Sequence, residues 1–442
     1  MSILQSRELM TAAALAASML LAACDNDTGS TALPGDDHDH DHAESTSGRL
    51  VFTTADGTNS RVYVHDLDEA ATVADFALTY PASAVHASPG GRYALVMQRD
   101  NDQVELLDSG VFPHDDHVDV LEPSMLGYVL SGVRPTHYRV NGDQAALFYD
   151  GNADAGILSR FELLTDASLG NGGVLASQSL DTAHHGIAEP LGGLVLSSHS
   201  PAAGGPADGI SVYALHNDHF HGEGALATSC PGLHGGASNE AWSAFGCEDG
   251  VLLAELHDDH FHESKAAVGE RIALVMGSHD VPHFAGFAYP SYNLYEIEPE
   301  TASASQVDWR DGAVDGAGEP VTAVLYGFDP HGEHLLILDN AGTLHVLDAM
   351  DWERLATIAL IDPIEEGAPA PALAFSGAEH HAFITDPANQ SVRVIDLETL
   401  AESDEAIQLD IVPANLAWTG VVEGDHDHDH EDEHDHEGEH DH

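Results

Sequence analysis

The chain has 442 residues, with 13 basic side chains, 75 acidic side chains and 32 histidines, and its formal net charge is −62. At roughly 100–200 residues per domain, this length allows two or three domains or one large all-β domain. The acidity excludes nucleic acid as a partner, because phosphate binding needs clustered Lys and Arg, and it argues against docking on anionic lipid through basic residues. Hydrophobic residues make up 43% of the chain, so a sizeable core can form.

The N-terminal segment is predicted to be an export signal rather than part of the fold. A mostly small, apolar run ends at Ala23 and is too short to cross a membrane. Residues 21–24 read LAAC and resemble a bacterial lipobox, which implies cleavage before Cys24 and diacylation of its thiol. We therefore expect residues 1–23 to be a lipoprotein signal peptide and the protein to lie in the periplasm, tethered to the inner or outer membrane through Cys24. A plain secretory signal that contains a cysteine is the alternative.

Histidine alternates with acidic residues near both ends of the chain. Residues 36–42 read DDHDHDH, and residues 423–442 read EGDHDHDHEDEHDHEGEHDH. Neither stretch has an apolar face, so we expect residues 24–48 to be a disordered, lipidated linker and residues 421–442 to be a disordered tail. Alternating imidazoles and carboxylates suit borderline divalent metals, zinc above all, although a merely solubilising tail is the alternative. The predicted auxiliary ligands are His38, His40, His42, His426, His428, His430, His434 and His436.

Residues 49–420 are predicted to form a single all-β domain. Short β-type runs are divided by Gly, Asp, Asn and Pro, and one plan of three strands recurs in residues 83–109, 321–349 and 372–400. A fourth, less regular strand leads to each following unit. The second strand of each unit ends in Asp, and the third ends in Leu-Asp or, in residues 372–400, in Ile-Asp.

The spacing of these units predicts a β-propeller. Aligned first strands recur about every 44 to 51 residues, and a period of this size with four strands per unit is typical of propeller blades. Eight aligned positions predict eight blades, with seven as the alternative. Residues 49–56 lack a first strand and residues 415–420 lack partners, so the two ends of the domain are predicted to complete one blade together. The aligned positions are His86, His137, His185, His234, His279, Ala323, Ala372 and Leu416.

Five consecutive aligned positions are histidines. The innermost strand of each blade lines the central channel, so three or four of these imidazoles are predicted to meet one metal ion. The three in the middle are the first choice, and a hydrogen-bonded structural role is the alternative for each. Asp150 and Glu189 are candidates for a fourth ligand or for the group that orients a ligand's second nitrogen. The predicted histidine ligands of the channel are His86, His137, His185, His234 and His279.

Three further clusters of histidine lie in predicted loops. The segment PHDDHVD (113–119) carries His114, Asp116 and His117 as candidate ligands, and its length allows it to fold over a channel opening. The segments HNDHFHGE (216–223) and HDDHFHES (257–264) are near-duplicates at the same place in adjacent blades. All three are interpreted as auxiliary metal sites or entry points, with solvated polar turns as the alternative.

The remaining motifs favour binding over catalysis. An oxidising periplasm favours a structural disulfide between Cys230 and Cys247. The chain contains no Gly-rich phosphate loop, no GxSxG, no HExxH and no CxxCH motif, so it is not predicted to be an enzyme. Metal ligands without a paired catalytic base suggest binding and release of the ion.

Five segments together resemble a known family. They are residues 132–151, 183–190, 230–253, 342–352 and 382–397, and they resemble AztD-type periplasmic zinc metallochaperones across essentially all of residues 49–420. The resemblance implies a β-propeller that carries Zn(II) to the solute-binding protein of a zinc ABC importer. It also implies that the middle three channel histidines and the 113–119 loop bind metal. The resemblance includes the pair of Cys230 and Cys247. The lipobox, the C-terminal tail and the doubled HFH loops depart from that family.

The expected function is therefore capture of Zn(II) and its transfer, by ligand exchange, to a solute-binding protein. The protein is expected to be a monomer anchored to a membrane by lipid. Two alternatives remain at this point. One is a periplasmic zinc buffer or sensor without transfer, and the other is a metal-dependent propeller hydrolase or lactonase.

Overall fold

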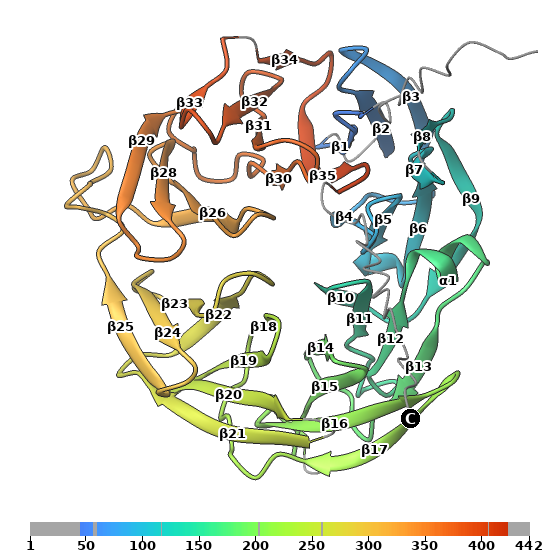
Figure 1. Cartoon of the computed structure of the whole chain (residues 1–442), viewed down its shortest axis with the longest axis vertical. Coiled ribbons are helices and arrows are strands. Elements are labelled where there is room, and N and C mark those ends of the chain that lie inside the picture. The colour runs from blue at the N-terminus through green and yellow to red at the C-terminus, as the bar shows by residue number, and fades with distance from the viewer. Residues whose placement is uncertain are drawn as a thin grey trace, which may run out of the picture. The chain divides into compact units, whose positions relative to one another are not determined.

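The described residues form a ring of eight antiparallel sheets, arranged as the blades of a propeller (Figure 1). The structure is a computed structural model that describes residues 45–55, 60–115, 117–201, 204–257, 260–404 and 406–422. The prediction of an eight-bladed, all-β propeller is confirmed. The predicted signal peptide, the lipidation site Cys24 and the tail histidines lie outside the described residues.

Blades 1 to 4 come from the N-terminal half of the described chain, and blade 1 also takes a strand from the C-terminal end. A two-stranded hairpin, β7 (Val111–His114) and β8 (His117–Val120), is inserted in blade 2. The strands of these blades are β1 (Arg49–Thr54), β2 (Arg61–Asp66), β3 (Ala71–Ala77) and β35 (Pro413–Thr419); β4 (Ala84–Ala87), β5 (Tyr93–Gln98), β6 (Gln103–Asp108) and β9 (Ser124–Ser131); β10 (Pro135–Asn141), β11 (Gln144–Tyr149), β12 (Arg160–Leu164) and β13 (Ala176–Ser179); β14 (Ala188–Leu191), β15 (Leu194–His199), β16 (Gly209–His216) and β17 (His219–Ala225).

Blades 5 to 8 follow in chain order, and in blade 8 two short strands, β33 and β34, both pair with β32. A five-residue helix, α1 (Asp166–Gly170), joins β12 to β13, and a short 3-10 turn, Arg99–Asn101, follows β5. The strands are β18 (Gly236–Ser238), β19 (Trp242–Cys247), β20 (Gly250–His257) and β21 (His260–Ala267); β22 (Ile272–Met276), β23 (Phe284–Ala288), β24 (Leu294–Glu298) and β25 (Ser303–Val307); β26 (Ala323–Phe328), β27 (His334–Asp339), β28 (Thr343–Asp348) and β29 (Arg354–Ala359); β30 (Leu373–Phe375), β31 (His381–Asp386), β32 (Ser391–Asp396), β33 (Ala401–Glu402) and β34 (Ile407–Gln408).

The two ends of the propeller meet in blade 1, as the sequence predicts. The strand β35 is the innermost strand of this blade and pairs antiparallel with β1. Leu50 lies opposite Trp418 in this pairing, and the Trp418 indole donates a 2.9 Å hydrogen bond to the Ser47 carbonyl. This pairing closes the ring.

The hydrophobic core lies between the blades. Successive residues of a strand point to opposite faces of its sheet. Each middle strand therefore contributes side chains to the core on both sides of its blade. Leu95 packs against blade 3, and its neighbour Val96 packs against blade 1. In the same way, Leu335 packs against blade 6 and Leu336 packs against blade 8. Both faces are buried, which explains why β5 and β27 are buried along their whole length and read as continuous apolar runs.

The Asp residues that end the repeated strands have a local role. The Asp348 carboxylate accepts hydrogen bonds from the backbone N–H groups of Met350 and Asp351, and Asp396 does the same for Glu398 and Thr399. An Asp side chain that accepts from the backbone two or three residues later stabilises a tight turn. The Asp that ends a third strand therefore marks the turn that follows it.

The expected disulfide between Cys230 and Cys247 is present, with both cysteines fully buried. It joins the loop that enters blade 5 to the end of β19, within the core between blades 4 and 5. The part of the chain that the structure describes contains no helix long and apolar enough to cross a membrane.

Ring closure by β35 generates a stability prediction. Deletion of residues 413–442 removes buried Leu416 and Trp418 and leaves the inner edge of β1 without its partner. Loss of these side chains costs at least about 5 kcal/mol, so cooperative thermal unfolding should be lost or its midpoint strongly lowered. The matched control is deletion of residues 423–442, which keeps β35. If the two truncated proteins unfold at the same temperature in calorimetry, closure by β35 does not stabilise the ring.

Candidate metal centre

Three histidines from consecutive blades approach one another at the inner edge of the ring. His137 lies in β10, whereas His185 and His234 lie in the segments that enter β14 and β18. The ring centroids are 4.8 Å apart for His137 and His185, 5.4 Å for His185 and His234, and 6.1 Å for His137 and His234. Three imidazoles bound to one tetrahedral zinc have centroids about 5 Å apart. The structure thus brings together the three residues that were the first choice from the sequence, and we call them the three-histidine centre.

Each imidazole of the centre is anchored through Nδ1. The acceptors are the Gly186 carbonyl for His137 at 2.7 Å, the Asp150 carboxylate for His185 at 3.1 Å, and the Ala273 carbonyl for His234 at 2.8 Å. Because oxygen can only accept here, Nδ1 carries the proton and the lone pair lies on Nε2. Metal-binding histidines are commonly oriented in this way by a carbonyl or carboxylate behind the ring. Each of these three hydrogen bonds joins one blade to a neighbouring blade.

The environment favours the neutral form of two histidines of the centre. Burial first, and the nearby Arg139 guanidinium second, lower the pKa of His137 to about 3. Burial also lowers the pKa of His234. Only neutral imidazole can ligate a metal, so protons do not compete for these two side chains near neutral pH.

Asp150 follows β11 and lies behind His185. Burial acts to raise its pKa, but hydrogen bonds from His185, Thr136 and Arg99 outweigh this effect, and the pKa is lowered. The Arg99 guanidinium of blade 2 lies 2.7 Å from its Oδ2 atom. The other oxygen, Oδ1, is buried and accepts no hydrogen bond from the described residues. Asp150 therefore orients His185, and it also has one carboxylate oxygen without a partner there.

Residues deeper along β10 tie the same three blades together. Alternate residues of a strand share one face, so Arg139 and Asn141 follow His137 toward blades 4 and 5. Arg139 donates to the Gly236 carbonyl at 3.0 Å and lies 3.2 Å from the Glu189 carboxylate. Asn141 donates to the carbonyls of Pro190 and Asn239. The inner strands of these three blades are thus cross-linked next to the histidines.

The centre offers ligands for a transition metal, but its ligand atoms are not as close together as those of a compact cluster. The donor set of three imidazoles and a nearby carboxylate suits zinc. The centre is not among the clusters of described residues in which three ligand atoms all lie within 4.8 Å of one another. Binding of one ion by all three histidines therefore requires the rings to move closer together.

Two of the predicted channel histidines do not join this centre. His86 lies in β4 and stacks on Tyr138, with ring centroids 5.2 Å apart, and burial lowers its pKa to about 4. His279 lies in an exposed turn, because β22 ends at Met276. The prediction that His279 occupies the first strand of its blade is wrong, since the irregular sequence there shifted the alignment past the end of the strand. It is also wrong for His185 and His234, which lie just before the first strands of their blades, although they still approach His137.

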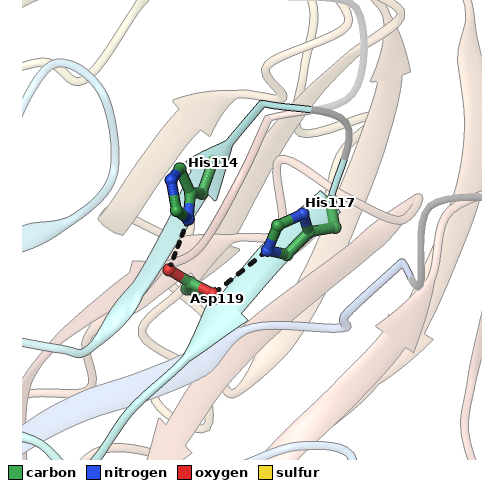
Figure 2. Close-up of side chains that lie close together, drawn as sticks. All are labelled: His114, His117 and Asp119. Carbon is green, nitrogen blue, oxygen red and sulfur yellow. Dashed lines mark hydrogen bonds and ion pairs between the residues drawn. The ribbon is translucent and has the colours of Figure 1, made fainter. Parts of the chain in front are cut away.

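The predicted loop cluster at residues 113–119 forms the tip of the β7–β8 hairpin, and Figure 2 shows its side chains. Both His114 and His117 reach Asp119, at 3.1 Å from Nδ1 and 3.3 Å from Nε2 respectively, and the three ligand atoms lie within 4.8 Å of one another. Asp116, the acidic residue proposed from the sequence, lies outside the described residues. In Figure 1 the hairpin lies beside β6 and β9 in the outer part of blade 2 rather than across the centre of the ring.

Asp119 is the one residue of this cluster that the sequence analysis missed. A signal for it exists in the sequence. His117 and Asp119 are two residues apart in a strand, so their side chains share one face, and the tight turn places His114 opposite His117.

The propeller fold and the three-histidine centre define a class: an eight-bladed β-propeller with a candidate transition-metal site at its inner edge. No family model matches the chain. The chain is 26% identical over 405 residues to "Zinc chaperone AztD" of Citrobacter koseri, covering 87% of this chain and 90% of that protein. The structure of apo AztD from the same organism matches with a TM-score of 0.70 and 22% identity, covering 85% of this chain and 99% of that one.

A second crystal structure of Citrobacter koseri AztD matches with a TM-score of 0.69. The dihydro-heme d1 dehydrogenase NirN matches with a TM-score of 0.53 and 12% identity over 87% of this chain and 77% of that one, which shows a shared fold only. The resemblance to AztD-type proteins that the sequence predicts is confirmed. The named relative is a zinc chaperone rather than an enzyme.

Glu189 below the centre generates a prediction about pH. Burial raises its pKa to about 7, although Arg139 acts to lower it, whereas the ordinary value is 4.5. The folded state then holds this proton more tightly than the unfolded state, so stability is highest below about pH 4.5 and falls as pH rises to about 7. The Glu189→Gln variant should not show this fall, and the difference between the two proteins should reach about 3 kcal/mol by pH 8.

Chemical denaturation at intervals from pH 4.5 to 8 measures this difference. The control is Glu240→Gln, which removes an exposed carboxylate and should keep the wild-type pH slope. Equal slopes for the Glu189→Gln variant and the wild type would show that Glu189 is not protonated by burial.

Proposed function

We propose that this chain is a zinc chaperone that binds Zn(II) and transfers it to the solute-binding protein of a zinc ABC importer. The observation that carries the proposal is the approach of His137, His185 and His234, each anchored through Nδ1 with its Nε2 lone pair available. The similarity to a zinc chaperone along most of the chain supports zinc as the ion.

The proposed mechanism is a relay by ligand exchange. The His-rich tails, which lie outside the described residues, capture Zn(II) weakly and quickly. The three-histidine centre then holds the ion more tightly, with Asp150 orienting His185 or supplying an oxygen ligand. An acceptor protein docks and substitutes its own ligands one at a time, which requires a coordination position that the chaperone leaves open. The chain carries out no chemical turnover in this scheme.

The location follows from the same proposal. A lipoprotein signal at residues 1–23 and a lipid on Cys24 would hold the protein in the periplasm at a membrane surface. An importer's solute-binding protein works in that compartment, so the anchor would keep chaperone and acceptor close together. Bound to the membrane in this way, the protein is proposed to act as a monomer.

The ligand assignment predicts the effect of removing the centre. The triple variant His137→Ala, His185→Ala and His234→Ala should lose tight zinc binding by about 100-fold or more, because all three nitrogen ligands are removed. Competition with a chelator of known affinity measures the change, and circular dichroism checks the fold. The control is His279→Ala, which changes an exposed turn and should leave binding unchanged. Wild-type affinity in the triple variant would exclude the three-histidine centre as the tight site.

Transfer is tested with the same proteins. Zinc-loaded chaperone mixed with apo solute-binding protein should pass its ion faster than it releases zinc spontaneously to a chelator. Transfer no faster than spontaneous release would favour a zinc buffer.

In the proposed relay the tails bind Zn(II) weakly and the three-histidine centre binds it tightly. This scheme predicts the effect of removing the C-terminal tail. Deletion of residues 423–442 removes alternating His and acidic residues and leaves β35 in place. The number of weakly bound zinc ions should fall, whereas the affinity of the tight site should stay within about twofold, because no ligand of the centre is touched. Isothermal titration of the two proteins gives both quantities. Loss of the tight site together with the tail would contradict the relay.

A further inference from the structure

Two outer hairpins in neighbouring blades repeat one pattern of histidines. The hairpin β16–β17 of blade 4 carries HNDHFH (216–221), and the hairpin β20–β21 of blade 5 carries HDDHFH (257–262). Their registers also agree, since His216 pairs with His219 and His257 pairs with His260 across the two turns. Both hairpins lie on the third and outermost strands of their blades, whereas the three-histidine centre lies at the innermost strands (Figure 1).

The strand register places the histidines of each hairpin on one face. Side chains two residues apart share a face of a strand, and so do directly paired residues across the ladder. His219 and His221 therefore lie on the same face as His216, and all three are exposed. Phe220 points to the opposite face and is 9% exposed, with its ring centroid 5.0 Å from that of Phe161 in blade 3. The buried phenylalanine fixes which face of the hairpin meets the solvent.

Blade 5 is built in the same way. Phe261 packs against the core between blades 4 and 5, and His260 and His262 lie on either side of it in the strand. The ring centroids of His257 and His262 are 4.2 Å apart.

The nitrogens are spaced for chelation. His219 and His221 have their Nε2 atoms 3.0 Å apart, and the corresponding distance between His260 and His262 is 3.3 Å. Two nitrogens bound to one tetrahedral zinc lie about 3.3 Å apart. Asp218 lies 3.2 Å from Nδ1 of His219, which places the proton on that nitrogen and the lone pair on Nε2.

The two hairpins differ in one ligand. Glu255 lies opposite His262 in the ladder, and its carboxylate is 2.8 Å from Nε2 of His257. The ligand atoms of Glu255, His257 and His262 all lie within 4.8 Å of one another. In blade 4 the residue opposite His221, at the position that corresponds to Glu255, is Ala214. The blade 5 hairpin thus offers a carboxylate in addition to its imidazoles.

We propose that these hairpin tips are two surface sites for a borderline divalent cation, Zn(II) above all, and that the blade 5 site binds it more tightly. Histidine nitrogen with one carboxylate favours Zn(II) over Ca(II) and Mg(II), which prefer all-oxygen sites. The ligands are open to solvent, so the ion enters and leaves without passing the inner strands. These sites add binding capacity that is separate from the function proposed for the three-histidine centre.

Histidine footprinting on the full chain tests this proposal. Diethyl pyrocarbonate labels neutral imidazole, and mass spectrometry of the peptides reports each hairpin separately from the tails. Added Zn(II) should protect both hairpins, with half-protection of blade 5 at about a tenfold lower free Zn(II) concentration than blade 4. Ca(II) should protect neither. Unchanged labelling at saturating Zn(II) would overturn the proposal.

Two single substitutions test whether the Glu255 carboxylate causes the difference in Zn(II) affinity between the two hairpins. Glu255→Ala should raise the concentration for half-protection of blade 5 to that of blade 4, and Ala214→Glu should lower that of blade 4 by about tenfold. If neither substitution moves protection, Glu255 is not a ligand and the stated order of the sites is wrong. Both hairpins should also remain protected in the triple variant of the three-histidine centre, so failure of that centre would leave these sites standing. Thermal unfolding confirms that each variant is folded.

Discussion

Pairing between β35 and β1 is the constraint on which the rest of this structure depends. An open row of eight blades would leave apolar strand faces exposed at both ends, because every blade buries both of its faces against neighbours. Closure by strands from opposite ends of the chain removes those exposed faces and fixes the angle between successive blades. The inner strands of blades 3 to 5 are then held close enough for their histidines to meet.

Within that ring, hydrogen bonds between blades decide how the histidines point. His137, Arg139 and Asn141 occupy one face of β10, and each reaches a backbone carbonyl of blade 4 or blade 5. The imidazoles are oriented through Nδ1 and backed by a cross-linked layer of polar groups. With a formal net charge of −62, the chain also generates a negative field that attracts cations over a distance of about 8 Å at physiological salt. The negative field attracts cations in general, whereas the imidazoles select the kind of metal ion, so the two make separate contributions to metal binding.

Several features of the site followed from the sequence because they depend on local pattern. Short apolar strands and turns that begin with Asp recur in the well-formed repeats, so the blades and the approach of His137, His185 and His234 were predictable. His279 was misplaced where the repeat is irregular, since a strand boundary there has no local marker. His86 keeps its place in an inner strand but stacks on Tyr138, which depends on the packing of two blades. Asp119 was missed although strand alternation places it beside His117.

The sequence by itself determined the fold class, the number of blades, the closing strand and the residue types that can bind a borderline metal. Each of these depends on a periodic pattern or on composition, and both can be read along the chain. The tertiary structure alone decided how these histidines are held. The Gly186 and Ala273 carbonyls behind the imidazoles are backbone groups without a signature, and packing between blades decided that Asp150 rather than Glu189 reaches His185, 35 positions away. Distances between side chains of different blades depend on how the ring closes. The spacing of residues within one repeat does not contain this information.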